Sequence, residues 1–175
     1  SLEILRPVGI TADAPQNFEN GLMGLVPLAK VTHISASSPN IDVLNIADVI
    51  VRVASIEAPR MGQLRNFLAK QPDGDIALTV LRGGEKIELT AKLSDGKLGI
   101  LLENALDTPI IAQPLQEVLA DVDGELVPTP TVIAGQQLLG GSTFVSIHNW
   151  AQLRSLFIES QDVIIQFKNP TENHE

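Results

Sequence analysis

Short runs of alternating apolar and polar positions make up most of the chain, and two longer runs follow a helical period instead. In residues 61–70, Met61, Leu64 and Leu68 recur at intervals of three and four, which is the spacing of one helix face. Residues 150–158 form the second such run. The β-rich runs predict strands at residues 3–11, 28–34, 48–56, 76–82 and 86–93 in the first half, and at 98–103, 115–120, 131–139, 144–147 and 162–168 in the second. The pattern therefore predicts a mainly β chain with α-helix (an α+β chain), with one main helix in each half.

The second half of the chain repeats the first half at a nearly constant shift. The triplet Gln63-Leu64-Arg65 recurs as Gln152-Leu153-Arg154, a shift of 89 positions, and Val8-Gly9-Ile10 recurs as Leu98-Gly99-Ile100, a shift of 90. Three further matches have a shift of 87: Pro27-Leu28 with Pro114-Leu115, Ile46-Ala47 with Ile133-Ala134, and Asp75-Ile76 with Asp162-Val163. A period of this length indicates a tandem of domains, because solenoid units span only about 20–50 residues.

We therefore predict one domain at residues 3–94 and a second at residues 97–170. In this interpretation the second copy ends before it reaches the final hairpin partner that the first copy has. Residues 1–2 and 171–175 are interpreted as an expression scar and a tail. Because the chain starts with Ser1 and not with Met, we expect it to be a fragment of a longer protein.

Composition narrows the classes of partner. The chain has a net charge of −9, with 12 Lys and Arg against 21 Asp and Glu, and its basic residues form no cluster. Nucleic acids and anionic membrane surfaces are recognised by clustered basic residues, so neither is an expected partner. The chain has no cysteine, which excludes disulfides and thiolate metal sites. No apolar run approaches the roughly 18–20 residues of a membrane span, so direct membrane insertion by this segment is not expected.

Patterns that carry catalytic chemistry are missing from the sequence. The three histidines, His33, His148 and His174, are far apart and belong to no His-Glu-x-x-His motif. The chain has neither a Gly-x-Ser-x-Gly elbow nor a glycine pattern for phosphates or dinucleotides. We therefore predict no enzyme activity, no metal site and no cofactor for this chain.

Several motifs of the first copy resemble those of bacterial PDZ domains. Ser38-Pro39 resembles the corner after the first long strand of that family, and residues 44–50 resemble its Gly-Asp-x-Ile segment, with Ala47 where Gly is usual. Residues 76–84 resemble the closing strand that ends in Arg-x-Gly. Leu98-Gly99-Ile100 resembles the Leu-Gly-Ile that opens such domains in HtrA-type serine proteases and site-2-type membrane metalloproteases. The second copy matches less well, because residues 134–138 depart from the Gly-Asp-x-Ile pattern.

This resemblance implies two PDZ-like, partly open β-barrels or sandwiches, each with one main helix. Domains of this family bind an extended peptide by adding it to a strand edge, and a glycine loop offers backbone N–H groups to the terminal carboxylate. The implied loops are Gly9-Ile10-Thr11 and Gly99-Ile100-Leu101. The implied helix walls are Met61, Leu64 and Leu68 in the first copy, and Leu153 and Phe157 in the second. The alternative is that these apolar side chains are core residues and that the glycines form bulges in edge strands.

The predicted function is that of a non-catalytic PDZ tandem that binds a peptide or protein or has a regulatory role. We expect it to be excised from a larger bacterial protein, a protease. Its predicted partner is a peptide, an unfolded protein segment or the protease domain of its own parent chain. By resemblance we expect a periplasmic or other extracytoplasmic location, with tethering to the membrane through the rest of the parent protein. The alternative is a structural spacer or docking module without peptide binding. Coverage of the groove by the insertion at residues 12–26 would favour that alternative.

Overall fold

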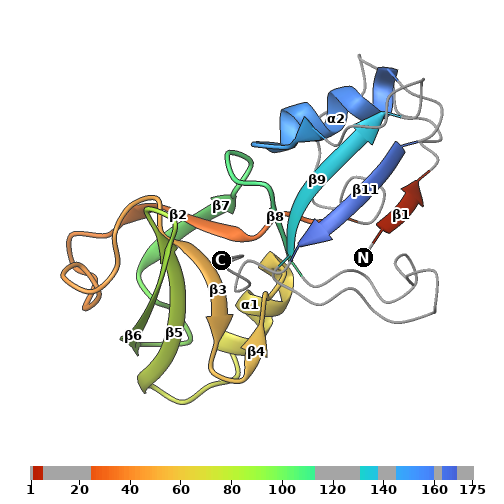
Figure 1. Cartoon of the computed structure of the whole chain (residues 1–175). Helices are drawn as coiled ribbons and strands as arrows, with labels where there is room; N and C mark the ends of the chain where they lie inside the picture. The colour runs from red at the N-terminus through yellow and green to blue at the C-terminus, as the bar shows by residue number, and fades with distance from the viewer. Residues whose placement is uncertain (1, 6–24, 113–130, 138–144, 160–162, 169–175) are drawn as a thin grey trace. The chain divides into compact units, whose positions relative to one another are not determined.

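The computed structural model describes residues 2–5, 25–112, 131–137, 145–159 and 163–168 (Figure 1). The chain divides into two compact units. We call Leu28–Ala105 the central unit, and we call Ser1–Pro27 together with Leu106–Glu175 the flanking unit. The names refer to position in the sequence, since the central unit is inserted between the two parts of the flanking unit.

The central unit is an antiparallel sheet with one helix. Its elements are β2 (Ala29–Ile34), β3 (Val49–Val53), β4 (Ile56–Glu57), α1 (Met61–Leu68), β5 (Gly74–Arg82), β6 (Glu85–Leu93) and β7 (Ile100–Asn104). The strands lie in the order β6-β5-β3-β2-β7, and β4 pairs with β3 at the side of this path (Figure 1). The helix and the strands predicted between residues 28 and 94 are confirmed to within two residues at most ends.

The longest paired segment of the central unit is the hairpin of β5 and β6. Its register runs from Gly74 opposite Leu93 to Arg82 opposite Glu85, so each strand contributes nine residues. Gly83 and Gly84 form the turn, with φ of 61° and 89°. Two consecutive residues with positive φ match the twist of a tight hairpin, and glycine adopts that conformation without steric cost.

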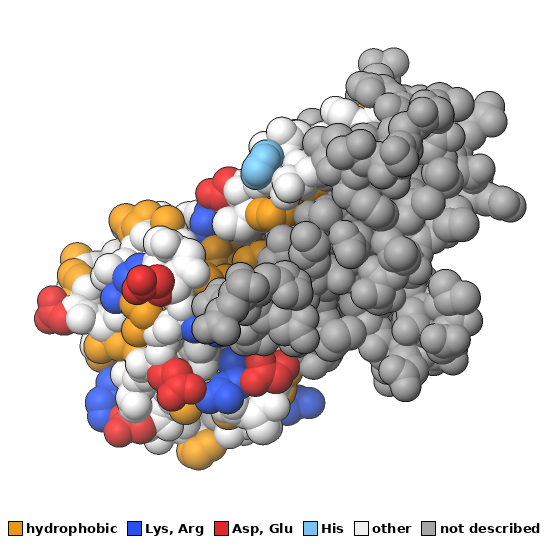
Figure 2. All heavy atoms as spheres, viewed as in Figure 1, with side chains coloured by type: hydrophobic (Ala, Val, Ile, Leu, Met, Phe, Trp, Pro, Cys, Tyr) orange, Lys and Arg blue, Asp and Glu red, His pale blue; other side chains and the backbone are white. Residues whose placement is uncertain are grey.

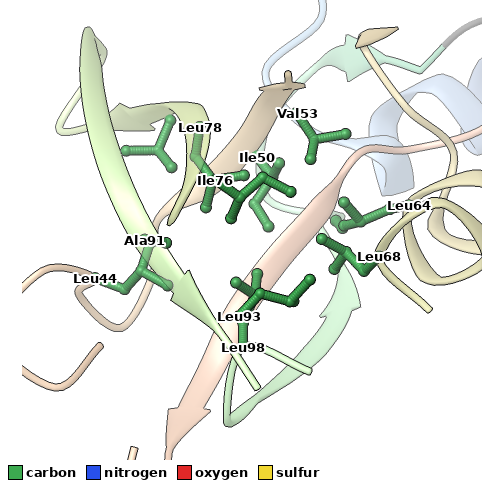
Figure 3. Close-up of a cluster of buried hydrophobic side chains, with 12 residues drawn as sticks. Leu44, Ile50, Val53, Leu64, Leu68, Ile76, Leu78, Ala91, Leu93 and Leu98 are labelled. Atoms are coloured by element: carbon green, nitrogen blue, oxygen red, sulfur yellow. The ribbon is translucent and has the colours of Figure 1, made fainter. Parts of the chain in front are cut away.

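The core of the central unit lies between the sheet and α1. The helix buries Leu64 and Leu68, which point toward the side chains of the strands (Figure 3). At its start, the side-chain oxygen of Gln63 accepts a hydrogen bond from the backbone N–H of Arg60 at 3.0 Å. Each fully buried leucine stabilises the fold by about 2 kcal/mol. The buried cluster consists of Ala29, Leu44, Ile50, Val53, Leu64, Leu68, Ile76, Leu78, Val80, Ala91, Leu93 and Leu98.

The flanking unit is a second antiparallel sheet with its own helix. Its elements are β1 (Leu2–Leu5), β8 (Ile110–Ile111), β9 (Thr131–Gln137), β10 (Val145–Ser146), α2 (Trp150–Glu159) and β11 (Val163–Lys168). The strands lie in the order β1-β11-β9-β10, and β8 also pairs with β9. The strand predicted at residues 115–120 lies outside the described residues.

The division of the chain differs from the domains predicted at residues 3–94 and 97–170. Strand β7, which was expected to open the second domain, pairs with β2 and belongs to the central unit. Strand β1, which was expected to open the first domain, pairs with β11 of the flanking unit. Strand β11 therefore has an antiparallel partner. That partner is β1, from the N-terminus, and it takes the place of the hairpin strand that the second half of the sequence lacks. Strand pairing depends on matching edges and buried faces, and these do not follow chain order.

The two units nevertheless share one pairing scheme. The pairs β2–β3, β3–β4, β3–β5 and β5–β6 of the central unit correspond to β8–β9, β9–β10, β9–β11 and β11–β1 of the flanking unit. The helices start at Met61 and Trp150, which preserves the shift of 89 positions. The match between Ile46-Ala47 and Ile133-Ala134 is wrong at the level of structure, because Ala47 lies in a turn before β3 whereas Ala134 lies within β9.

Candidate functional site

A groove in the central unit runs between α1 and the edge strand β7. It encloses about 340 Å³. Three elements line it: α1, the loop between β6 and β7, and β7 itself. The lining residues are Arg65, Leu68, Gly96, Lys97, Leu98, Ile100, Leu101 and Leu102.

Strand β7 is an edge of the sheet, and its outer side pairs with no strand among the described residues. The carbonyl of Gly99 accepts a hydrogen bond from the backbone N–H of Ser35 at 3.0 Å. Ile34 and Ile100 therefore face each other as a non-hydrogen-bonded pair of the antiparallel ladder. In such a pair the N–H and C=O groups point away from the partner strand. The N–H of Ile100 thus points toward the open edge.

The loop before β7 is held from one side by a turn at residues 35–40. The carbonyl of Leu98 accepts hydrogen bonds from Ser38 Oγ at 2.9 Å and from Asn40 Nδ2 at 2.8 Å. In a trans peptide the N–H points opposite to the C=O of the same unit. The N–H groups of Gly99 and Ile100 therefore point away from this turn. Successive backbone N–H groups of this kind can bind an anion when they point to one side.

Asn40 is the residue that fixes this loop, and sequence reasoning missed it. Its side chain is fully buried. Besides Leu98, its amide donates to the carbonyl of Lys92 at 2.8 Å and accepts from the N–H of Lys92 at 2.7 Å. It therefore joins the end of β6 to the start of the groove. In the sequence, an asparagine after Ser38-Pro39 resembles an ordinary turn residue, and only its burial reveals this role.

Two glycines allow the close approach of this loop to its neighbours. Gly99 has a φ of +69°, and a Cβ there would lie 2.7 Å from Ser38 Oγ and 2.9 Å from Ser38 Cβ. Gly96 also has a φ of +69°, and a Cβ there would lie 2.9 Å from the Cα of Ala69, just after α1 ends. Neither position accepts a larger residue without displacement of backbone or buried atoms. Gly96 thus allows the loop to approach the C-terminal end of α1, and Gly99 allows it to approach Ser38.

The residues predicted for a binding site are only partly brought together. Ile100 and Leu101 line the groove with Leu68, although the sequence pattern assigned them to different domains, and Gly99 precedes Ile100 in the chain without lining the groove. Leu64 is fully buried in the core, as the alternative interpretation expected, and Met61 packs half-buried against the same core.

The other predicted site residues lie away from this groove or outside the described residues. Leu153 is fully buried beside Trp150, Pro109 and Ile147, with no room for a water molecule between them. Phe157 lies in α2. Gly9, Ile10 and Thr11 lie outside the described residues, as does most of the insertion at residues 12–26.

A buried ion pair lies outside the groove and supports the loop that leads into β3. Arg82 Nε donates to Asp48 Oδ1 and Arg82 Nη2 donates to Asp48 Oδ2, both at 2.8 Å, and the Asp48 side chain is fully buried. Its Oδ2 also accepts from the N–H of Asn45 at 2.8 Å. The hydrogen bond and charge of Asp48 raise the pKa of the Arg82 guanidinium, although burial acts in the opposite direction. This pair closes the end of the β5–β6 hairpin onto the turn and has a structural role.

The surface of the central unit carries charges of both signs interspersed with apolar side chains (Figure 2). Arg52 pairs with Glu57 at 3.5 Å and with Glu88 at 3.2 Å, and Lys92 pairs with Asp75. Arg65 and Lys97, the two cations that line the groove, have no carboxylate partner within the part of the chain that the structure describes. The groove therefore combines apolar walls with unpaired positive charge.

The described residues contain no group of three or more His, Cys, Asp or Glu side chains that could hold a metal ion. None of the helices in the described ranges is long and apolar enough to cross a membrane. Compared with known proteins, the chain matches no protein-family model and no curated protein.

Proposed function

We propose that the central unit is a PDZ-like module that binds the C-terminal end of a protein chain without catalysing a reaction on it. The observation that carries this proposal is the convergence of three features at one end of the groove. These are the open edge of β7, the outward N–H groups of Gly99 and Ile100, and the apolar wall that includes Leu68. An extended peptide requires an edge, a terminal carboxylate requires donors, and an apolar side chain requires a pocket.

The ligand would extend the sheet as a further strand beside β7. Its terminal carboxylate would accept hydrogen bonds from Gly99 and Ile100, at the start of β7. The side chain of its last residue would enter the apolar part of the groove, formed by Leu68, Leu98, Ile100 and Leu102. Burial of one aliphatic side chain contributes about 1.5–3 kcal/mol. The hydrogen bonds of an ionised carboxylate are stronger than those between neutral groups.

In this proposal the elements of the central unit are circularly permuted relative to the expected domain. The sequence resemblance placed the glycine loop and its strand at the start of a domain. In the central unit that strand is β7, the last element in sequence, and it pairs with β2, the first. The first and last strands of the proposed module, β2 and β7, therefore pair with each other. The proposed binding strand, β7, follows the β5–β6 hairpin in sequence.

We further propose that this module belongs to a larger bacterial envelope protein and serves a protease of the same chain. This part rests on the resemblance to domains of envelope proteases, and the partner would be a peptide, an unfolded segment or the protease domain itself. The flanking unit has a different role in the proposal. Trp150 and Leu153 are buried at the start of its helix, which favours a structural or docking function there.

The test is a titration of the whole 175-residue chain with fluorescent peptides that end in Val, Leu or Ile. We expect saturable binding, and we expect amidation of the terminal carboxylate to abolish it, because the two N–H donors then lose their anion. Chemical shift changes of the Ile100 and Leu101 amides would map the ligand to β7. Absence of binding by every peptide up to millimolar concentration would exclude the proposed function.

A further inference from the structure

The second open edge of the central sheet is β6, the strand at the opposite end of the strand order from β7 (Figure 1). Its outer side pairs with no strand in the part of the chain that the structure describes. Its side chains alternate, so that Lys86, Glu88 and Thr90 are exposed whereas the residues between them face the core. An open edge presents backbone donors and acceptors that can pair with a strand of another chain.

The contacts of Asn40 show which backbone groups of β6 point outward. The Asn40 side chain donates to the carbonyl of Lys92 at 2.8 Å and accepts from the N–H of Lys92 at 2.7 Å. Both backbone groups of Lys92 therefore point away from β5. This orientation alternates along an antiparallel pair, and the register of β5 and β6 runs without a shift. The backbone groups of Lys86, Glu88 and Thr90 therefore also point outward, whereas those of Lys92 are already bonded.

Two apolar side chains at this edge are incompletely covered. Ile87 and Leu89 lie on the core face of β6 and pack against the core, but both are only partly buried. Ala91 and Leu93, the next two residues on the same face, are buried. No described strand lies beyond β6 to cover Ile87 and Leu89. A strand added to this edge would remove more of their apolar surface from water, which is favourable.

The charges of β6 restrict how two copies of this edge could pair. In an antiparallel pair related by a two-fold axis, outward residues of one strand face outward residues of the other. Registers that set Lys86 against Lys86, or Glu88 against Glu88, place like charges opposite each other, which is destabilising. Registers that set Thr90 against Glu88 or against Thr90 bring another residue to the edge of Lys92, which Asn40 already occupies.

One register of these outward groups avoids both conflicts. It sets Lys86 of each copy opposite Glu88 of the other, so that two pairs of opposite charge form by symmetry. Ile87 then lies on the two-fold axis, opposite Ile87 of the second copy. Lysine on an edge strand ordinarily opposes pairing with another chain. Here the glutamate two residues later supplies the opposite charge that such a lysine requires.

We propose that two copies of this chain associate through β6 in this register, with Lys86 of each copy opposite Glu88 of the other. The association joins two central sheets into one continuous antiparallel sheet and covers Ile87 from both sides. The occupant of the edge is thus a second copy of the chain. The inference goes beyond the proposed function and does not rest on it, because β7 is the other edge of the sheet.

The expected association is weak because it involves one short strand. Interfaces that bury less than about 1,200 Å² are typically transient, so we expect a dissociation constant of about 100 µM. Analytical ultracentrifugation of the whole chain from about 10 µM to about 1 mM covers this range. Lys86→Glu and Glu88→Lys should each raise the dissociation constant at least about tenfold, because each variant places like charges opposite each other twice.

A mixture of the two variants is the decisive sample. Each variant alone should remain monomeric, but an equal mixture should associate again, because every Glu then faces a Lys. Lys70→Glu is the matched control: it makes the same charge change as Lys86→Glu at an exposed position just after α1. This control should leave the association unchanged. Circular dichroism of each variant confirms that it folds.

Three outcomes would overturn the inference. The first is a chain that remains monomeric at about 1 mM, ten times the expected dissociation constant. The second is a dimer that neither β6 variant weakens, because another surface, such as the edge of β7, would then form the contact. The third is equal weakening by Lys70→Glu, which would assign the effect to net charge. Recovery of the dimer in the mixture supports the proposed register.

Discussion

The central and flanking units use one strand-pairing scheme but differ at the face where the helix meets the sheet. In the central unit α1 starts with the half-buried Met61, and a groove remains open between Leu68 and β7. In the flanking unit α2 starts with Trp150, which is 1% exposed and fills the space beside Pro109 and Ile147. The two helix starts therefore differ in packing: Met61 is half-buried, whereas Trp150 is fully enclosed.

The units also differ in how the chain completes them. In the central unit β5 continues through a tight turn into β6 and then into the glycine loop and β7. In the flanking unit the strand equivalent to β6 is β1, which comes from the N-terminus. The loop and edge strand of the groove follow directly from a hairpin of two nine-residue strands, and β7 itself pairs with β2.

The largest effect is expected from a cavity at the start of each helix. Trp150→Ala should lower the free energy of unfolding of the flanking unit by about 3–5 kcal/mol, because it removes a fully buried aromatic side chain. Met61→Ala should cost the central unit only about 1 kcal/mol, because Met61 is partly exposed. Hydrogen exchange of the β11 and β5 amides reports the two units separately. Equal losses in the two variants would contradict the difference in packing.

A smaller effect is expected at the glycine loop. Gly99→Ala should destabilise the central unit by about 2–3 kcal/mol, because it combines a positive φ with an overlap on Ser38. It should also weaken peptide binding, since the two N–H donors shift with the loop. Urea denaturation and peptide titration measure the two effects.

Gly62→Ala is the matched control for that variant. Gly62 lies within α1, and nothing lies within 4 Å of the Cβ that the substitution adds. Alanine is the better helix former, so a gain of about 0.5–1 kcal/mol is expected. If both alanine variants change stability with the same sign, the geometry of the glycine loop is refuted.

The smallest effect compares Ala47 with Ala134, which the sequence repeat had aligned. Ala47 has a φ of 73°, where a side chain costs about 1–2 kcal/mol relative to glycine. Ala47→Gly should therefore stabilise the central unit, by about 0.5 kcal/mol after the entropy of glycine is included. Ala134→Gly should destabilise the flanking unit by about 0.5–1 kcal/mol, because Ala134 lies inside strand β9. Thermal unfolding of both variants measures the opposite signs.

Local pattern was sufficient for most elements and for some residues that line the groove. The helical stripe of Met61, Leu64 and Leu68 predicted α1, and Gly83-Gly84 predicted the hairpin of β5 and β6. The resemblance of residues 98–100 to a glycine loop was sufficient to identify Ile100 as a candidate, and Ile100 does line the groove. Asn40 was missed because its hydrogen bonds reach Lys92 and Leu98, more than 50 positions away in sequence.

What the sequence determined by itself is therefore the list of elements and their approximate repeat. Periodicity and turn residues act over a few positions, so they can be read without knowledge of the fold. Only the tertiary structure decided which strand completes each sheet: β7 pairs with β2, and β1 pairs with β11. The physical reason is that strand edges pair through backbone groups that every residue carries, so the choice of partner depends on burial of the whole face. That choice joins the glycine loop to the helix that precedes it in the chain, and it creates the groove.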